Sequence, residues 1–214
     1  MILMDKIEVK MYTLGVIGTN CFLVINKETK ETIIIDPADR PDFLASEIRK
    51  FGLTPAAILL THGHFDHIGG VNGLRDEFGL KVYAHEDEQD ILASAQLNSS
   101  IMMGDSFAVT TKADVLLKDG QELDLAGIHI KVLHTPGHTK GGCSYYIPAE
   151  GVVFAGDTLF NGSIGRTDFP TGSMSDLIRG VREKLFTLPD DTVVYPGHMS
   201  ATTIGREKQY NPFF

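Results

Sequence analysis

The stretch Ile58-Leu59-Leu60-Thr61-His62-Gly63-His64-Phe65-Asp66-His67-Ile68-Gly69-Gly70 decides which fold and which chemistry the sequence predicts. Residues 56–60 have the length and the aliphatic content of a buried strand. Alternate side chains of an extended segment share one side, so His62 and His64 are expected to converge on one point. Imidazoles placed in this way are suited to bind zinc, iron or manganese.

Two further metal-competent residues follow within the same stretch. Asp66 and His67 come where the chain must turn toward a helical pattern that begins near Gly69, so they are expected to face a second point close to the first. The alternative interpretation is a polar turn that is rich in histidine by accident. Three of the chain's eight histidines fall within six positions and are interleaved with an aspartate, which favours a metal site.

Three polar residues later in the chain each follow a glycine near the end of an expected strand. They are His138, Asp157 and His198. Glycine allows a sharp turn and a close backbone approach, and loops at one end of a rigid scaffold are where sites are built. Each residue is a weak signal alone, but together with the first stretch they give seven candidate ligands. Seven are too many for one tetrahedral ion and suit two ions that share a bridging carboxylate.

The remaining pattern predicts two β-rich halves, each completed by helices. Residues 7–35 read as three strands, and amphipathic helices are expected at 41–51 and 71–79. The elements expected after these are an acidic helix at 86–93, strands near 128–132, 143–147, 152–155 and 192–195, a helix over Ser175–Phe186 with Ser175 as N-cap, and a closing helix from Thr202 or Thr203. This order fits two sheets packed face to face with helices outside, in one domain spanning residues 1–214.

Two smaller features leave alternatives open. Asp36, at the end of the third strand, either caps a loop or faces the metal region, and the loop role is the expected one. The segment Ala95–Phe107 has no clean period, as is common in functional covering segments. Its Met102 and Met103 either pack in the ordinary way, which is the expected interpretation, or line a substrate pocket.

Composition excludes several classes of protein. A net charge of −9 and the lack of any Lys/Arg cluster argue against a nucleic-acid partner. The two cysteines, Cys21 and Cys143, form no C-x-x-C pair and are expected to be buried thiols. The N-terminal segment 1–6 is too short and too soon charged for a signal peptide, and no apolar run reaches the ~20 residues of a membrane span. A cytoplasmic protein without a membrane partner is therefore expected.

The seven-residue pattern resembles the metallo-β-lactamase superfamily, as judged from His62-x-His64-x-Asp66-His67 with His138, Asp157 and His198 at these intervals. Residues 156–160 and 165–168 look like its glyoxalase II-like branch. The resemblance implies an α/β fold, the αββα four-layer sandwich with two mixed β-sheets. It also implies one metal ion held by His62, His64 and His138 and another held by Asp66, His67 and His198. Asp157 would bridge the two ions, which would be zinc, iron or manganese.

By the same resemblance, the chain is expected to be a metal-dependent hydrolase that cleaves a small-molecule thioester such as S-lactoylglutathione. A hydroxide bridging the two metals would be the nucleophile, with Asp66 and Asp157 as catalytic residues. Asp157 stands where true lactamases usually have Cys or Ser, which points away from lactam substrates. Arg166 is expected either to bind a substrate carboxylate or to brace its loop together with Asp168.

The sequence also departs from the glyoxalase II pattern. Because the sequence ends at Phe214, the additional C-terminal helical region that helps glyoxalase II to hold glutathione is expected to be absent. Sulfur dioxygenases, which resemble residues 165–169, supply the main alternative function, with a single iron at His62, His138 and Asp157. Related nucleases share the His-rich motif, but the negative charge disfavours that function. A monomer and a homodimer are both compatible with the sequence.

Overall fold

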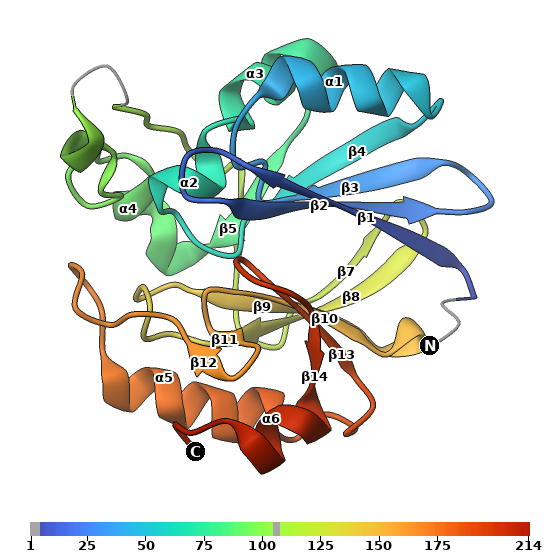
Figure 1. The fold of residues 1–214 in the computed structure, drawn as a ribbon. Helices are drawn as coiled ribbons and strands as arrows, with labels where there is room; N and C mark the ends of the chain where they lie inside the picture. Colours follow the sequence, from blue (N-terminus) through green and yellow to red (C-terminus); the bar gives the residue numbers. More distant parts are fainter. Residues whose placement is uncertain (1–4, 105–107) are drawn as a thin grey trace.

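The computed structural model describes residues 5–104 and 108–214. Residues 1–4 of the N-terminal segment and residues 105–107 of the segment 95–107 lie outside this described part. Figure 1 shows two β-sheets facing each other, with helices on the outer side of each. The predicted αββα arrangement with two mixed sheets is therefore confirmed.

The first sheet has the strand order β1-β2-β3-β4-β5-β6. Its first three strands are antiparallel, and the pairs from β3 to β6 are parallel. The strands are β1 (Ile7–Leu14), β2 (Thr19–Asn26), β3 (Glu31–Ile35), β4 (Thr54–Leu59), β5 (Val82–His85) and β6 (Val115–Leu117). The helices of this half are α1 (Pro41–Lys50), α2 (Phe65–Ile68), α3 (Val71–Phe78) and α4 (Gln89–Leu92), with 3-10 turns at Glu86–Glu88 and Ser100–Met103.

The second sheet has the order β14-β13-β10-β9-β8-β7 and is also mixed, because β10 and β13 are parallel. Its strands are β7 (Glu122–Leu125), β8 (Ile128–His134), β9 (Cys143–Ile147), β10 (Val152–Gly156), β13 (Val193–Pro196) and β14 (Thr202–Thr203). A separate hairpin is formed by β11 (Leu159–Phe160) and β12 (Ser163–Ile164). The outer helices are α5 (Met174–Gly180), continued by a π-helical turn at Val181–Leu185, and α6 (Ile204–Tyr210), with a further 3-10 turn at Pro148–Glu150.

Alternation along the central strands divides the apolar residues among three layers of core. In β3, Ile33 and Ile35 face the core between the sheets, whereas Ile34 packs with Leu44 and Ile48 of α1. In β10, alternate residues likewise face the inter-sheet core and the layer under α5 and α6. Strands buried on both faces read as continuous apolar runs. The fold is thus two sheets that share a central core, and the loops that follow the strands start from this packed scaffold.

The helix that begins near residue 174 starts at a different cap from the expected one. The side chain of Ser173, not that of Ser175, accepts the hydrogen bond from the backbone N–H of Asp176. Ser173 has the extended backbone of an N-cap and its oxygen reaches a free N–H of the first turn. The expected N-cap at Ser175 is wrong, whereas the closing helix does begin after Thr203, which caps it.

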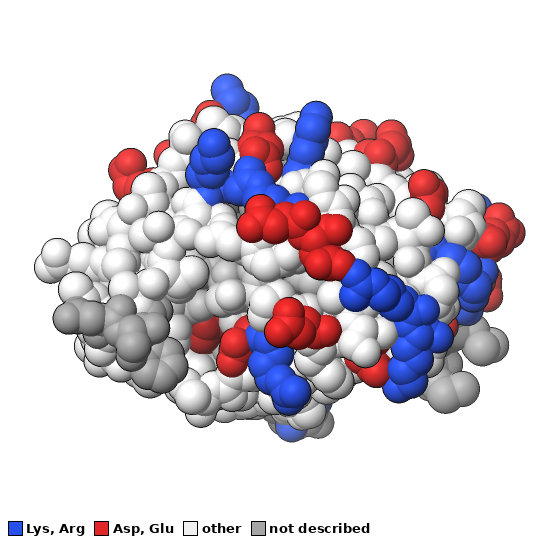
Figure 2. Space-filling model, turned by 90° about the horizontal axis from the view of Figure 1, so that it is seen from above, with Lys and Arg blue, Asp and Glu red and all other residues white. Residues whose placement is uncertain are grey.

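The surface over α1 and α3 carries mixed charge. On the face drawn in Figure 2, basic and acidic side chains lie side by side. Arg49 of α1 pairs with Glu77 of α3, and Lys50 pairs with Glu47. The expectation that the protein has no nucleic-acid partner stays a prediction. Within residues 5–104 and 108–214, no helix is long and apolar enough to cross a membrane.

Candidate metal centre

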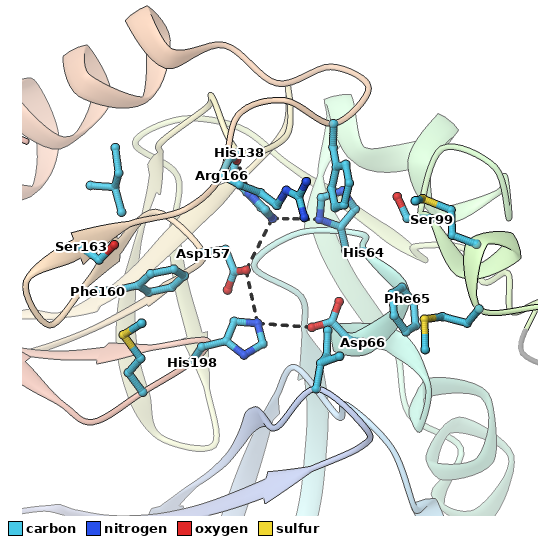
Figure 3. A pocket seen from close by; sticks show the side chains of 16 residues that line it. His64, Phe65, Asp66, Ser99, His138, Asp157, Phe160, Ser163, Arg166 and His198 are labelled. Atoms are coloured by element: carbon cyan, nitrogen blue, oxygen red, sulfur yellow. Dashed lines mark hydrogen bonds and ion pairs between the residues drawn. The ribbon is translucent and has the colours of Figure 1, made fainter.

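The loops that carry the predicted ligands leave strand ends on one edge of the two sheets. His62 and His64 follow β4, and Asp66 and His67 lie on the short helix α2 directly after them. The other three candidates follow strands of the second sheet: His138 comes after β8, Asp157 after β10 and His198 after β13. Figure 3 shows side chains from both sheets pointing into the same pocket.

Three imidazoles form the first group. The ligand atoms that His62, His64 and His138 offer all lie within 4.8 Å of one another. His64 Nδ1 and His138 Nε2 are 2.8 Å apart, and all three side chains are buried. The ring of His138 is held in its orientation by its Nδ1–H, which donates a hydrogen bond of 2.7 Å to the backbone oxygen of Arg166. This bond leaves Nε2 of the ring facing the group.

The second group contains Asp66, His67 and His198, and its ligand atoms also lie within 4.8 Å of one another. Asp66 Oδ2 is 3.3 Å from His67 Nε2 and 3.4 Å from His198 Nε2. Asp157 lies between the two groups. Its Oδ2 is 3.5 Å from His138 Nε2 and 3.4 Å from His198 Nε2, and its Oδ1 is 3.4 Å from His67 Nε2. The structure thus brings all seven predicted side chains together, with a carboxylate where two ions would be bridged.

Close packing of the loops depends on glycine at two positions. A Cβ on Gly197 would clash with the Asp157 carboxylate and the His67 ring, and a Cβ on Gly156 would clash with Thr61. Gly156 also has a φ of +49°, which disfavours other residues. These glycines explain why Asp157 and His198 each follow one directly in the sequence.

Burial and neighbouring charges shift the pKa values of the histidines in the cluster in opposite directions. Burial, followed by the neighbouring imidazoles, holds the pKa of His62 well below its usual range. Burial also lowers the pKa of His64 to about 3. Burial opposes the charged form of His198, but hydrogen bonds to Asp157 and Asp66 outweigh it and raise its pKa to about 9. His62 and His64 are therefore neutral ligands at neutral pH, whereas a cation in the second group must displace a proton.

The carboxylates of Asp66 and Asp157 are ionised because the histidines around them lower their pKa values. Burial alone would raise the pKa of Asp66, but His67, His198 and Thr19 outweigh burial and lower it to about 2. The pKa of Asp157 is likewise held well below its usual range, since His67 and His198 overcome the effect of burial. Two buried negative charges thus lie among imidazoles, which is the environment that favours a divalent cation.

Comparison with known proteins places this geometry in a family. Residues 14–198 match the family described as the metallo-beta-lactamase superfamily. The chain belongs to the metallo-beta-lactamase superfamily. The resemblance drawn from the seven-residue pattern is therefore confirmed.

Two curated relatives in the superfamily are similar over nearly their whole length. The Probable metallo-hydrolase YqgX of Bacillus subtilis (strain 168) is 40% identical over 199 residues, which cover 93% of this chain and 93% of that protein. The Hydroxyacylglutathione hydrolase GloC of Haemophilus influenzae is 38% identical over 200 residues, which cover 91% of this chain and 92% of that protein. The similarity to a protein named hydroxyacylglutathione hydrolase supports the glyoxalase II-like resemblance in part.

Three solved structures of the superfamily resemble this one closely. The BLEG-1 B3 metallo-beta-lactamase has a TM-score of 0.92 and 42% identity, covering 96% of this chain and 99% of that one. TTHA1623, solved in a di-iron-bound form, has a TM-score of 0.84 and 38% identity, covering 96% and 100%. ETHE1 from Myxococcus xanthus has a TM-score of 0.80 and 30% identity, covering 96% and 83%.

The divalent metals that the superfamily implies fit the residues present here. Four buried side-chain atoms of the cluster have no hydrogen-bond partner among the described residues: His62 Nε2, His64 Nε2, His67 Nε2 and Asp157 Oδ1. A buried polar atom without a partner is costly and calls for an explanation, such as an ion. Imidazole nitrogens and carboxylate oxygens are ligands for zinc, iron and manganese. That these seven residues bind metal ions stays a prediction, now with suitable geometry.

A further group of metal-competent residues is less suited to bind an ion. His85, Asp87 and His134 also offer ligand atoms within 4.8 Å of one another. The rings of His85 and His134 stack in parallel, with centroids 3.9 Å apart and an interplanar angle of 7°. The nitrogen lone pairs of two stacked rings lie in two parallel planes, so they do not converge on one ion. His134 Nε2 in addition donates to the backbone oxygen of Lys140.

Asp36 has both of the roles that the sequence left open, because it caps the loop that begins at Thr61 and also supports the metal centre. Its Oδ2 accepts a hydrogen bond of 2.9 Å from His67 Nδ1, and it also binds the backbone and hydroxyl of Thr61. A carboxylate behind an imidazole fixes the ring and its tautomer, and directs the other nitrogen at the ion. Thr19 plays a similar part, since its hydroxyl donates to Asp66 Oδ2 at 2.6 Å. Thr19 carried no signal in the sequence, because strand threonines are common.

Glu88 was also missed by sequence reasoning, although it lies in the acidic helix expected at 86–93. Its carboxylate is fully buried and joins two ligand-bearing loops. Oε2 accepts from the backbone N–H of Gly63, between His62 and His64. Oε1 accepts from the Thr139 hydroxyl and from the N–H of Gly141, beyond His138. Burial raises the pKa of Glu88 to about 7, against the lowering effect of these three donors.

Replacing Glu88 by glutamine is expected to weaken metal binding by the three-histidine group about 10- to 100-fold. An amide keeps the shape but has one acceptor oxygen for three donors, so the two loops are no longer held together. Competition titration of Zn²⁺ against a chromophoric chelator measures the change. Glu150→Gln is the matched control, because Glu150 is also buried but binds the N–H of Lys6 instead. Equal affinities in the two variants would contradict the role given to Glu88.

Arg166 lies at the rim of the site and is already paired. Its guanidinium makes a two-pronged contact with Asp168, at 2.8 and 2.7 Å, and lies 3.7 Å from the centroid of the Phe169 ring. Of the two roles expected for Arg166, the loop-bracing contact is present. Arg166 also lines the cavity over the metal cluster, so a substrate-binding role stays a prediction.

A cavity of about 490 Å³ opens directly over the cluster. Five of the seven predicted ligands line it: His64, Asp66, His138, Asp157 and His198. Met102 and Met103 line it as well, so the expectation of ordinary packing was wrong.

The cysteines are buried free thiols, as expected, and His129 is exposed on the outer side of β8.

Proposed function

We propose that the protein is a metal-dependent hydrolase that cleaves a thioester. The observation that carries the proposal is the position of Asp157, in contact with both three-residue groups at the floor of a substrate-sized cavity. A bridging carboxylate between two nitrogen-rich groups is suited to a pair of divalent ions. The similarity to GloC, a protein named as a hydroxyacylglutathione hydrolase, supports a thioester substrate.

Each residue of the cluster has a defined part in this chemistry. His62, His64 and His138 would hold one divalent ion, and Asp66, His67 and His198 the other, with Asp157 shared. Metal ions bound there would lower the pKa of a water from 15.7 to about 7 and polarise a carbonyl oxygen. Asp36 and the Arg166 carbonyl keep the rings of His67 and His138 in place.

Asp66 is the residue that we expect to orient the attacking water. It is ionised, it lines the cavity, and Thr19 and His198 hold its Oδ2, so the carboxylate cannot swing away. A thiolate is a good leaving group without a general acid, because thiols have a pKa of about 8.5. No protein nucleophile is required. Cys21 and Cys143 are unsuited to that role, because both are buried and burial raises the pKa of each thiol.

Purified protein loaded with Zn²⁺ is expected to hydrolyse thioesters, S-lactoylglutathione among them, with thiol release followed by a chromogenic disulfide reagent. The same preparation without metal serves as the control. A chromogenic β-lactam belongs in the panel, because BLEG-1 is named as a B3 metallo-beta-lactamase. Cleavage of the β-lactam without cleavage of any thioester would contradict the proposal.

The second candidate function is a persulfide dioxygenase with a single iron. It rests on the resemblance of residues 165–169 to sulfur dioxygenases, which use positions matching His62, His138 and Asp157. The assembly of Asp66, His67 and His198 as a second group favours two ions and hence the hydrolase. Oxygen uptake with glutathione persulfide, at one iron per chain and without thioester cleavage, would decide for the dioxygenase.

A further inference from the structure

The wall of the cavity away from the histidines and aspartates is apolar. It is built from segments far apart in the sequence: the turn after β1, the 3-10 turn at Ser100–Met103, the hairpin β11–β12, and the loops after β12 and β13. The apolar residues that line it are Ile17, Phe65, Met102, Met103, Phe160, Ile164, Phe169 and Met199. The mouth of the site is thus a rim of aliphatic, thioether and aromatic side chains around a polar floor (Figure 3).

Several of these side chains are far more exposed than apolar residues of their size usually are. The exposed fraction is 70% for Met102, 57% for Met199 and 49% for Ile17. Exposed apolar residues scattered singly need no explanation, but a cluster around one concave site marks a place where apolar surface is bound. Methionine suits such a rim, because its flexible thioether adapts to chains of different shape.

The same cavity offers little to a charged substrate. Among the described residues that line it, Arg166 is the one lysine or arginine, and its Nε and Nη2 already donate to the carboxylate of Asp168. Glutathione carries two carboxylates, and binding them would require cations that are free to pair. Among the described residues, the remaining polar side chains that line the wall away from the cluster are those of Ser99 and Ser163. Charge recognition of a peptide thiol is therefore not built into this wall.

We propose that the protein acts on thioesters with an apolar acyl chain, which the rim of Met102, Met199 and Ile17 covers while the carbonyl faces Asp157. This inference rests on the proposed thioesterase function and specifies its substrate. The acyl chain is the occupant because the apolar wall is continuous with the metal cluster, so that one ligand spans both. The thiol part leaves through the open mouth and needs no dedicated pocket.

A series of S-acyl-N-acetylcysteamine thioesters tests the inference, with acetyl, butanoyl, hexanoyl and octanoyl groups on the same thiol. Burial of one CH₂ stabilises the complex by about 0.8 kcal/mol, so kcat/KM is expected to rise about fourfold for each carbon that the cavity covers. Octanoyl thioester is also expected to be a better substrate than S-lactoylglutathione. A flat dependence on chain length, or a preference for S-lactoylglutathione, would overturn the inference while leaving a thioesterase. Failure to cleave any thioester would instead overturn the proposed function.

The Met102→Ala variant identifies the apolar rim as the source of the preference. It is expected to lower kcat/KM for the octanoyl thioester about fivefold, mainly through KM, and to lower kcat/KM for the acetyl thioester by a smaller factor, so that the dependence on chain length becomes shallower. Met11→Ala is the matched control, because Met11 is 47% exposed on β1 and does not line the cavity. If Met102→Ala changes the sedimentation mass and not the chain-length dependence, the rim is a contact between two copies of the chain and the inference is overturned.

Discussion

Replacing Asp157 by alanine is expected to lower turnover of a thioester by about a thousandfold or more. Asp157 contacts both groups through its carboxylate, at 3.4 Å from His67 and His198 and 3.5 Å from His138. Without Asp157, no carboxylate joins the two metal sites. The His198 ring also loses one of the two carboxylates that raise its pKa. Steady-state kinetics of the Zn²⁺-loaded variant, with its metal content measured in parallel, tests this expectation.

The controls for Asp157→Ala separate a lost ligand from a disturbed fold. Asp157→Asn keeps the volume beside Gly197 but removes the charge, and it is expected to lose nearly as much activity. His129→Ala is expected to keep nearly full activity, because His129 is exposed and pairs with Asp124 on the outside of β8. Equal losses at Asp157 and His129, or normal turnover without Asp157, would contradict the assignment.

Removal of the metal ions is expected to abolish turnover and to destabilise the protein. Ligands that bind only the folded state stabilise it by about 4.1 kcal/mol per site at a thousandfold excess over Kd. For a chain of this size, 1 kcal/mol corresponds to about 2–4 °C in Tm, so each occupied site should raise Tm by about 8–16 °C. The buried atoms His62 Nε2, His67 Nε2 and Asp157 Oδ1 are the physical reason, since they have no hydrogen-bond partner in the described residues and a bound ion would supply one.

Differential scanning fluorimetry before and after dialysis against a chelator measures this change, and Zn²⁺, Fe²⁺ and Mn²⁺ are then added back separately. Recovery of both Tm and turnover with a divalent ion is the expected result. The binding of an ion to the second group displaces a proton, because the pKa of His198 is raised to about 9. Metal affinity should therefore weaken as the pH falls. An unchanged Tm and full activity after metal removal would contradict the proposed metal centre.

The predicted ligands were visible in the sequence because each lies in the loop or short helix that follows a strand. The short spacing of His62, His64, Asp66 and His67 fixes their directions locally. His138, Asp157 and His198 were found by a different signal, a glycine directly before each of them, and the structure shows that glycine is required there for close packing at Gly156 and Gly197. The two-sheet architecture followed from apolar runs that alternate between two buried faces.

The supporting residues were harder to predict, since their roles depend on contacts between distant segments. Asp36 and Glu88 each bridge parts of the chain separated by 25 residues or more, and nothing local distinguishes them from a loop cap or a solvated acid. The exposure of Met102 depends on the loops that surround it. The N-cap at Ser173 was missed because two serines flank Met174, and backbone geometry decides between them.

The most direct test of the account is a crystal structure of the Zn²⁺-loaded protein with anomalous diffraction at the zinc edge. Two peaks about 3.5–4 Å apart are expected. One should be bound by His62, His64 and His138, the other by Asp66, His67 and His198, with an oxygen of Asp157 about 2.0–2.2 Å from both. The absence of a peak at the cluster, or a single ion that leaves Asp66, His67 and His198 uncoordinated, would contradict it.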